Sequence, residues 1–200
     1  MRDATSFSVQ FEGGILVLRL HSKDGTNRLT QTGVGLLTEA IEPLAHERRP
    51  LVIAGNANFF SAGADLHEIA QLDGVQAYDF ARAGQKLMNS IEHFPAPVYA
   101  AISGYCMGGG LDLALACHVR IAAPNAIFGH RGSALGLITG WGGTQRLPRV
   151  IGKANALHMF VAAEKIAAAD SLRIGLIDTI ADDPVNETMR RIAAGQHIFS

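Results

Sequence analysis

Three consecutive glycines and a lone carboxylate occur together in YCMGGGLDLALA, residues 105–116. Glycines are costly to order, and Asp112 is costly to bury among leucines and alanines. A glycine backbone at the start of a helix, however, offers uncovered N–H groups next to the partial positive charge of the helix end. The chemistry that this segment indicates is the stabilisation of a negatively charged oxygen.

A second segment has the same order of buried strand, small-residue loop and helix: LVIAGNANFFSAGADLHEI, residues 51–69. Ligands of open α/β folds bind beyond the carboxyl ends of the strands. Two such loops side by side would supply two convergent N–H donors, which is how an oxyanion hole is built. Each loop alone is equally well a tight turn where a helix packs on a strand, and no GxxxxGK[ST] phosphate loop is present.

The elements that must position these loops are short apolar runs alternating with helical patterns. We expect two strands within 9–20 around a Gly13-Gly14 turn, a loop over 56–66, and further strands over 51–56, 96–104, 118–123 and 126–130. Helices are expected over 30–46, 66–92 (interrupted near Asp73-Gly74), 109–116, 154–162 and 167–175. This alternation predicts an α/β protein with crossover connections. We expect one domain over 1–200, with its core over about 7–182 and a short helix over 184–195.

Composition and charge exclude several classes of binding partner. The 200 residues are 48% hydrophobic and carry a formal net charge of -1, which gives no footprint for nucleic acid or an anionic membrane surface. The apolar run over 97–123 is broken by glycines, Asp112 and His118, so no membrane span is expected. The histidines lack HxH or HExxH spacing, and no metal site is assigned. Cys106 and Cys117 lack CxxC spacing, which predicts buried structural thiols in a reduced, cytoplasmic protein.

Three segments together resemble a known family: FFSAGADL, then PVYAAISGYCMGGGLDLALAC, then FGHRGSALGLITGWGGTQRLPRVIG. Their order and spacing are similar to those of the enoyl-CoA hydratase/isomerase (crotonase) superfamily. The resemblance implies a crotonase-like spiral of repeated ββα units, assembled as a homotrimer or a dimer of trimers. It also implies an acyl-CoA thioester as ligand, a place in fatty acid metabolism, and no cofactor other than the coenzyme A of the substrate.

The resemblance assigns roles to residues of the two loops. It implies that the backbone N–H groups of Ala64 and Gly109 hold the thioester oxygen as it gains enolate character. Other loop residues would contact coenzyme A: Ala62, Asp65, Leu66 and Gly108. Arg28 is either a partner of the CoA phosphates or an exposed cation with no role.

The chain also departs from the family pattern. Family hydratases use two glutamates as general acid and base; the first position here is Asp112, one CH₂ shorter, and the second is Gly132. His130 and Arg131 flank the empty position, and each would either reach the site or point to solvent. Asp112 itself has a structural alternative, because an acid in the first turn of a helix stabilises it by about 0.3–1 kcal/mol.

Two further features concern the acyl pocket. Trp141 is expected either to wall this pocket or to pack under the following helix, which GGTQRL opens near Gln145 and Arg146. Only VNETMRRIAAGQHIFS follows the last apolar run, where family members usually carry several helices. The resemblance therefore implies a shortened C-terminal helical region, with the pocket open or completed by a partner subunit.

The leading prediction is a 2-enoyl-CoA hydratase with Asp112 as the sole carboxylate acid/base. An enolate-forming acyl-CoA decarboxylase or a thioester hydrolase is the alternative enzyme, because either needs the oxyanion hole more than two carboxylates. A non-catalytic protein that binds CoA esters is the third hypothesis.

Overall fold

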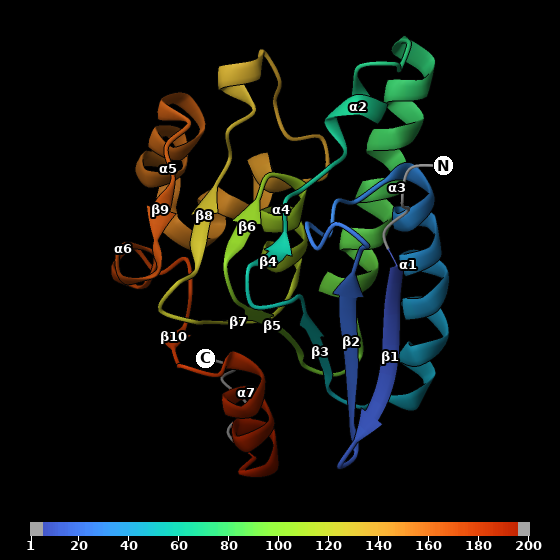
Figure 1. Cartoon of the computed structure of the whole chain (residues 1–200), viewed down its shortest axis with the longest axis vertical. Coiled ribbons are helices and arrows are strands. Elements are labelled where there is room, and N and C mark those ends of the chain that lie inside the picture. The colour runs from blue at the N-terminus through green and yellow to red at the C-terminus, as the bar shows by residue number, and fades with distance from the viewer. Residues whose placement is uncertain (1–5, 196–200) are drawn as a thin grey trace.

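The computed structural model describes residues 6–195. One sheet has six strands in the order β1-β2-β3-β5-β7-β10 (Figure 1). Its members are β1 (Ser6–Glu12), β2 (Ile15–His21), β3 (Leu51–Ala54), β5 (Val98–Ile102), β7 (Val119–Ala122) and β10 (Thr179–Ile180). The β1–β2 pair is antiparallel and turns at Gly13 and Gly14, which both have positive φ, whereas all other neighbours are parallel. The predicted hairpin and the crossover connections are confirmed.

A second sheet of short strands lies beyond the ends of the first. Its order is β4-β6-β8-β9, formed by β4 (Phe59–Ser61), β6 (Tyr105–Met107), β8 (Ile127–Gly129) and β9 (Ile166–Ala167). The pairs β3 and β4, β5 and β6, and β7 and β8 each give one strand to each sheet before a helix follows. This repetition is the predicted spiral of ββα units.

The helices fill the space around the sheets. They are α1 (Gln31–Leu44), α2 (Leu66–Ile69), α3 (Gly74–Glu92), α4 (Gly109–Ala116), α5 (Gly143–Ala162), α6 (Ala168–Arg173) and α7 (Pro184–Ala193), with 3₁₀ turns η1 (Ala45–Glu47) and η2 (Ser133–Leu135). The predicted interruption near residue 73 is real, because Asp73 forms a capping box with Gln76 that starts α3. None of the helices within residues 6–195 is long and apolar enough to cross a membrane.

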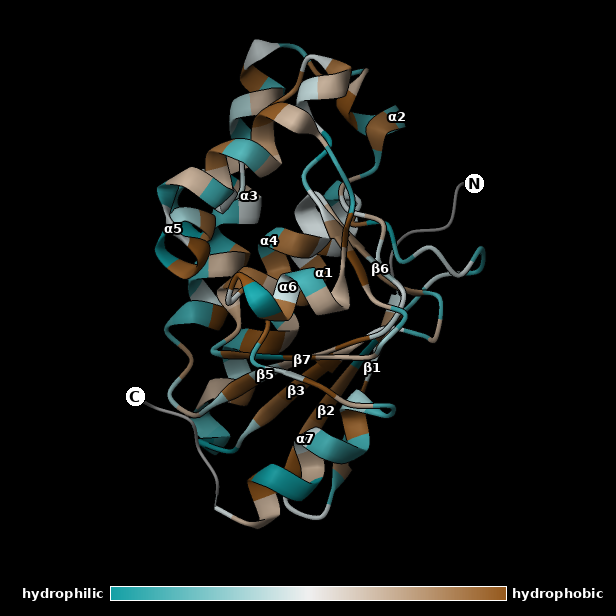
Figure 2. Ribbon diagram, turned by 90° about the vertical axis from the view of Figure 1, so that its left-hand side faces the viewer, coloured by the Kyte–Doolittle hydropathy of each residue, from teal (hydrophilic) through white to brown (hydrophobic). Residues whose placement is uncertain are grey.

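Apolar side chains cover both faces of the six-stranded sheet. Leu16, Leu18 and Leu20 of β2 belong to the large core that also contains the buried faces of α1, α3 and α4. The alternate residues Ile15 and Val17 point to the other face, which α7 covers. Figure 2 shows α7 on one side of the sheet and the other helices across it. Burial on both faces explains why these strands read as continuous apolar runs.

Two sequence-based expectations need correction. The expected loop over 56–66 contains β4, a strand of three residues, which is too short to show alternation. The helix expected over 154–162 is the second half of α5, which begins at Gly143. Gly152 interrupts α5 with φ of 79°, so the two halves meet at a kink that breaks the helical pattern.

Candidate active site

The two glycine-containing loops meet at the ends of β4 and β6. These strands are parallel neighbours, with Ser61 opposite Cys106, so the loops that follow them lie side by side. A Cβ added to Gly63 would lie 3.1 Å from the nitrogen of Gly109, and a Cβ added to Gly109 would lie 3.3 Å from the nitrogen of Ala64. The backbones are therefore in contact, which requires glycine at these places.

The hydrogen bonds of the neighbouring bridge and helix do not use the N–H groups of Ala64 and Gly109. The bridge between Leu29 and Ala64 uses the carbonyl of Gly63 and the N–H of Asp65. The N–H of Ala64 consequently points away from Leu29. Gly109 is the first residue of α4, whose first N–H groups have no partner within the helix. Gly108 precedes it with φ of 50° and ψ of -119°, a backbone conformation suited to glycine.

Both loops open into one pocket of about 570 Å³. Apolar side chains predominate in its wall, as is usual for small-molecule sites. Ten of the predicted site residues line it: Ala62, Ala64, Leu66, Gly108, Gly109, Asp112, His130, Arg131, Gly132 and Trp141. The structure thus brings together most of the residues that sequence reasoning singled out.

Asp65 and Arg28 are not in the wall of this pocket. The carboxylate of Asp65 accepts hydrogen bonds from the N–H groups of His67 and Glu68 and so caps α2. Arg28 lies on the surface, where its Nη1 is 2.7 Å from Oδ2 of Asp24. Their expected contacts with coenzyme A remain predictions.

Asp112 is buried at the centre of the site, with 1% of its side chain exposed. Its Oδ2 accepts a hydrogen bond from the hydroxyl of Thr139. Its Oδ1 lies beside Gly143, the first residue of α5, where any Cβ would overlap it. The N-terminal ends of α4 and α5 therefore both direct partial positive charge toward this carboxylate.

The side chains of His130 and Arg131, which flank Gly132 at the second glutamate position, point in different directions. His130 is buried, and its Nε2 lies 3.1 Å from Oδ1 of Asp112. Nε of Arg131 instead donates to the carbonyl of Ala163 at 3.1 Å, which ties it to the end of α5. A Cβ on Gly132 would lie 2.7 Å from the carbonyl oxygen of Leu137. The loop as folded leaves no room for a side chain at residue 132.

Trp141 lines the pocket, as one expectation had it, and its ring packs against α3, which precedes it in the chain, whereas packing under the following helix was expected. Its ring lies 5.1 Å from that of Phe80, and its Nε1 donates to the carbonyl of Phe80 at 3.2 Å. A Cβ at either Gly84 or Gly109 would overlap the indole ring. Trp141 therefore fixes the separation between α3 and the start of α4.

The architecture and the site can be compared with known proteins. The family model for Enoyl-CoA hydratase/isomerase matches residues 10–198. The chain belongs to this family.

Relatives agree with this assignment. Over 149 residues the chain is 46% identical to a protein of Bacillus subtilis (strain 168) named "Probable enoyl-CoA hydratase". The match covers 73% of this chain but only 58% of that protein, so the chain spans less than two thirds of the relative.

Solved structures match nearly the whole chain. An enoyl-CoA hydratase from Bacillus anthracis has a TM-score of 0.88 and 31% identity, over 94% of this chain and 75% of that one. Pseudomonas aeruginosa DspI has a TM-score of 0.88 and 32% identity, over 98% and 76%. The two-sheet spiral is thus the crotonase fold.

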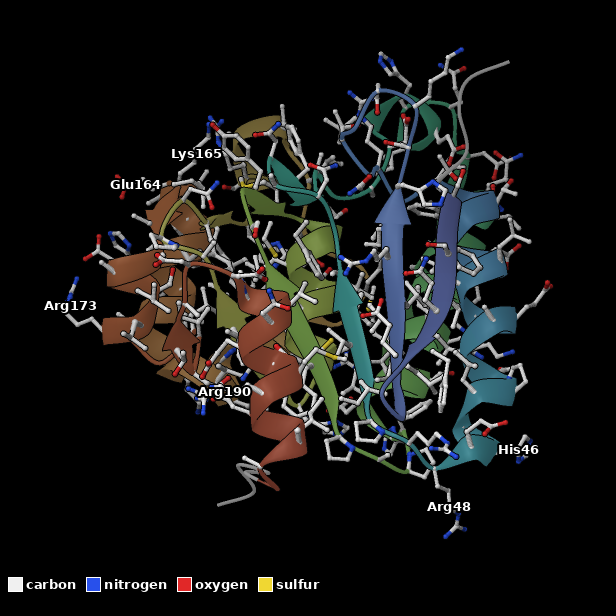
Figure 3. All side chains as sticks on the ribbon, turned by 60° about the horizontal axis from the view of Figure 1, so that its bottom comes forward. His46, Arg48, Glu164, Lys165, Arg173 and Arg190 are labelled. Atoms are coloured by element: carbon white, nitrogen blue, oxygen red, sulfur yellow. The ribbon has the colours of Figure 1, made fainter. Side chains whose placement is uncertain are left out.

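Sequence reasoning missed two residues of this family member's pocket. Thr139 is not among the residues predicted for the site, yet its hydroxyl holds Asp112. Lys165 lines the pocket, with its Nζ 4.9 Å from the centre of the Tyr105 ring. In Figure 3 it lies at the edge of the molecule beside Glu164. No local sequence pattern indicates either residue, because Thr139 lies in a loop and Lys165 directly before a strand, both far in sequence from the two glycine-containing loops.

The two cysteines are free and buried, as predicted for structural thiols. Burial raises the pKa of Cys117 to about 12, against a smaller opposing effect of the Arg120 charge. Burial also raises the pKa of Cys106, with smaller contributions from Cys117 and Asp112. A thiol held protonated is a poor nucleophile, so neither supplies covalent chemistry at neutral pH. Within residues 6–195 no three His, Cys, Asp or Glu side chains cluster to hold a metal ion.

Proposed function

We propose that this chain hydrates the double bond of 2-enoyl-CoA thioesters. The observation that carries the proposal is the meeting of two unpaired N–H groups, from Ala64 and Gly109, beside a buried carboxylate in one apolar pocket. The thioester oxygen would accept from both N–H groups as negative charge develops on it. Removing one such donor costs about 10²–10³ in rate, so this contact contributes much of the catalysis.

Asp112 is the group in our proposal that handles the water. Oδ2 is occupied by the Thr139 hydroxyl, which leaves Oδ1 to accept a proton from water. The water oxygen then bonds to Cβ of the enoyl group while the thioester becomes an enolate. Protonation of the enolate at Cα completes the addition. The apolar walls exclude other water from the enolate and strengthen the hydrogen bonds that hold it.

The test is hydration of crotonyl-CoA, followed as the loss of enoyl absorbance. Asp112→Asn is expected to lower kcat by about 10²–10⁴ because it removes a proton acceptor while keeping the shape of the side chain. Asp182→Asn, on the exposed segment before α7, is the matched control and should leave kcat unchanged. Unchanged turnover in Asp112→Asn contradicts the role of Asp112, and binding of crotonyl-CoA without turnover by the unmodified protein contradicts the reaction.

Assembly as a homotrimer or a dimer of trimers is part of the same proposal. Leu157 and Val161 of α5 and Leu172 of α6 are large apolar side chains that are exposed in the single chain. Contact between subunits would bury such side chains. The molar mass measured by light scattering checks this, and a monomeric mass contradicts it.

A further inference from the structure

His130 and Asp112 form a buried polar pair in the wall of the pocket. Nε2 of His130 and Oδ1 of Asp112 are 3.1 Å apart, with 4% and 1% of the side chains exposed. Both atoms are nevertheless without a hydrogen-bond partner in the part of the chain that the structure describes. They are close but not aligned for a bond with each other. Two adjacent buried atoms without a partner are costly, and this indicates that a polar ligand group completes the site.

The surroundings fix the pair in place. The Thr139 hydroxyl holds Oδ2 of Asp112, so that only Oδ1 is left to face His130. The imidazole ring packs against the ring of Phe160, with the centroids 5.1 Å apart at 45°. Gly143 lies against both groups, because a Cβ there would lie 3.0 Å from Nε2 of His130 and would overlap Oδ1. The pair is therefore confined by its neighbours on several sides.

The position that would hold a second carboxylate cannot supply one. Gly132 has no side chain, and its carbonyl accepts hydrogen bonds from the N–H groups of Leu135 and Leu137. The carbonyl of Leu137 in turn occupies the space that a Cβ would need. A second proton-transferring group must come from another residue, and His130 is two residues away with its ring in the pocket wall.

We propose that His130 is the second catalytic acid/base and that it works as a pair with Asp112. The inference rests on the proposed oxyanion hole. Oδ1 of Asp112 accepts one proton of a water molecule while the water oxygen bonds to Cβ, and the π electrons move to the thioester oxygen. His130 enters this step as the imidazolium, and the enolate takes the proton of its Nε2 at Cα, which leaves a neutral imidazole. Once the imidazole turns to align Nε2 with Oδ1, 3.1 Å away, the proton on Asp112 passes to Nε2. This restores the carboxylate and the imidazolium, so that H and OH have been added and nothing else has changed.

The test separates proton transfer from packing. His130→Gln keeps a polar group of similar length, and His130→Phe keeps an aromatic ring against Phe160. His158→Gln, on the exposed face of α5, is the matched control. For each protein, kcat and KM are measured with crotonyl-CoA, and exchange of the Cα protons of butyryl-CoA is followed in D₂O by NMR. Thermal unfolding shows which variants are folded.

We expect both His130 variants to lose about 10²–10⁴ in kcat, with KM within about threefold and with Cα exchange slowed by a similar factor. A folded His130→Gln protein with unchanged kcat and exchange overturns the proposal, as does a rise in KM alone. Exchange that depends on His130 in a protein that hydrates no enoyl-CoA supports the proposal and overturns the hydratase function. Absence of both reactions in the unmodified protein overturns both.

Discussion

Gly143, the first residue of α5, lies directly against the carboxylate of Asp112 in α4. A Cβ at residue 143 would overlap Oδ1 of Asp112, and it would also lie 2.8 Å from Cγ2 of Thr139 and 3.0 Å from Nε2 of His130. These three side chains come from three different segments, yet they enclose one backbone position. The start of α5 therefore supports the side chains that we propose as acid/base groups.

Gly143→Ala is expected to impair catalysis more than stability. The added methyl group must displace Asp112, and a shift of about 1 Å in a reacting group can lower the rate by about 10². Gly35→Ala in α1 is the matched control, because nothing lies within 4 Å of its added Cβ. We expect Gly35→Ala to keep full activity and gain about 0.5–1 kcal/mol in the free energy of unfolding. Wild-type kcat in Gly143→Ala would contradict the claim that the start of α5 positions Asp112.

Asp112→Glu is expected to lower the rate of crotonyl-CoA hydration instead of improving it. The longer side chain resembles the family's glutamate, but Gly143, Thr139 and His130 already occupy the surroundings of the carboxylate. One additional methylene in a packed interior costs about 1–3 kcal/mol and displaces its neighbours. A rate above that of the unmodified protein would show that the site accepts a side chain as long as glutamate, and would contradict this prediction.

Gly132→Glu is likewise expected not to restore a pair of carboxylates. Its Cβ would lie 2.7 Å from the carbonyl oxygen of Leu137, so the loop after β8 must open to accept it. We expect a lower melting temperature and no gain in kcat. Ala134→Glu places the same charge on an exposed residue of the same loop and should alter neither. A more active Gly132→Glu protein with an unchanged melting temperature would contradict this prediction.

The sequence predicted the framework of the site better than its chemistry. The two loops were predicted because in each a strand, a small-residue loop and a helix follow one another, and the family resemblance then implied Ala64 and Gly109 within them. Thr139 was not predicted, because its role depends on a loop that folds back against α4. No spacing in the sequence indicates that contact. The helix of Gly143 was placed too late, since Gly152 breaks the pattern in its middle. Local order was thus readable, whereas contacts between distant segments needed the fold.

Cys106 and Cys117 are expected to resist alkylation by iodoacetamide at neutral pH in the folded protein. Both are buried, and the pKa of Cys117 is raised to about 12. Thiolate is the reactive form, so modification requires unfolding. Mass spectrometry should find no adduct in buffer and two in denaturant. Rapid labelling of the native protein would contradict their burial.

His118 is expected to make stability fall at acid pH. Its Nδ1 accepts a hydrogen bond from the N–H of Val98 at 2.8 Å, which requires an unprotonated nitrogen. Burial lowers the pKa of His118 below its ordinary value of 6.5; the Arg120 charge adds to this, while the Glu92 carbonyl and charge oppose it. The unfolded state then binds the proton more readily, so this contribution is complete above pH 6.5 and is lost as the pH falls below it.

Urea unfolding at pH 7.5 and at pH 5.5 checks this prediction. The decrease in the free energy of unfolding between the two should be smaller in His118→Gln than in the unmodified protein. His158→Gln, which changes an exposed histidine, should keep the full decrease. An equal decrease in all three proteins would assign the pH dependence to other groups.

The pairing of β4 with β6 separates the backbone groups that we propose to bind the substrate from the side chains that we propose to act on it. Neighbouring strands lie about 4.7–4.9 Å apart whatever their side chains, so the distance between the two loops is set by the sheet. Asp112, His130 and Thr139 come instead from a helix and from the segment after β8, where residues can be exchanged without moving those strands. Such a scaffold would allow the reaction to change over evolution while the proposed hydrogen bonds to the thioester oxygen stay the same.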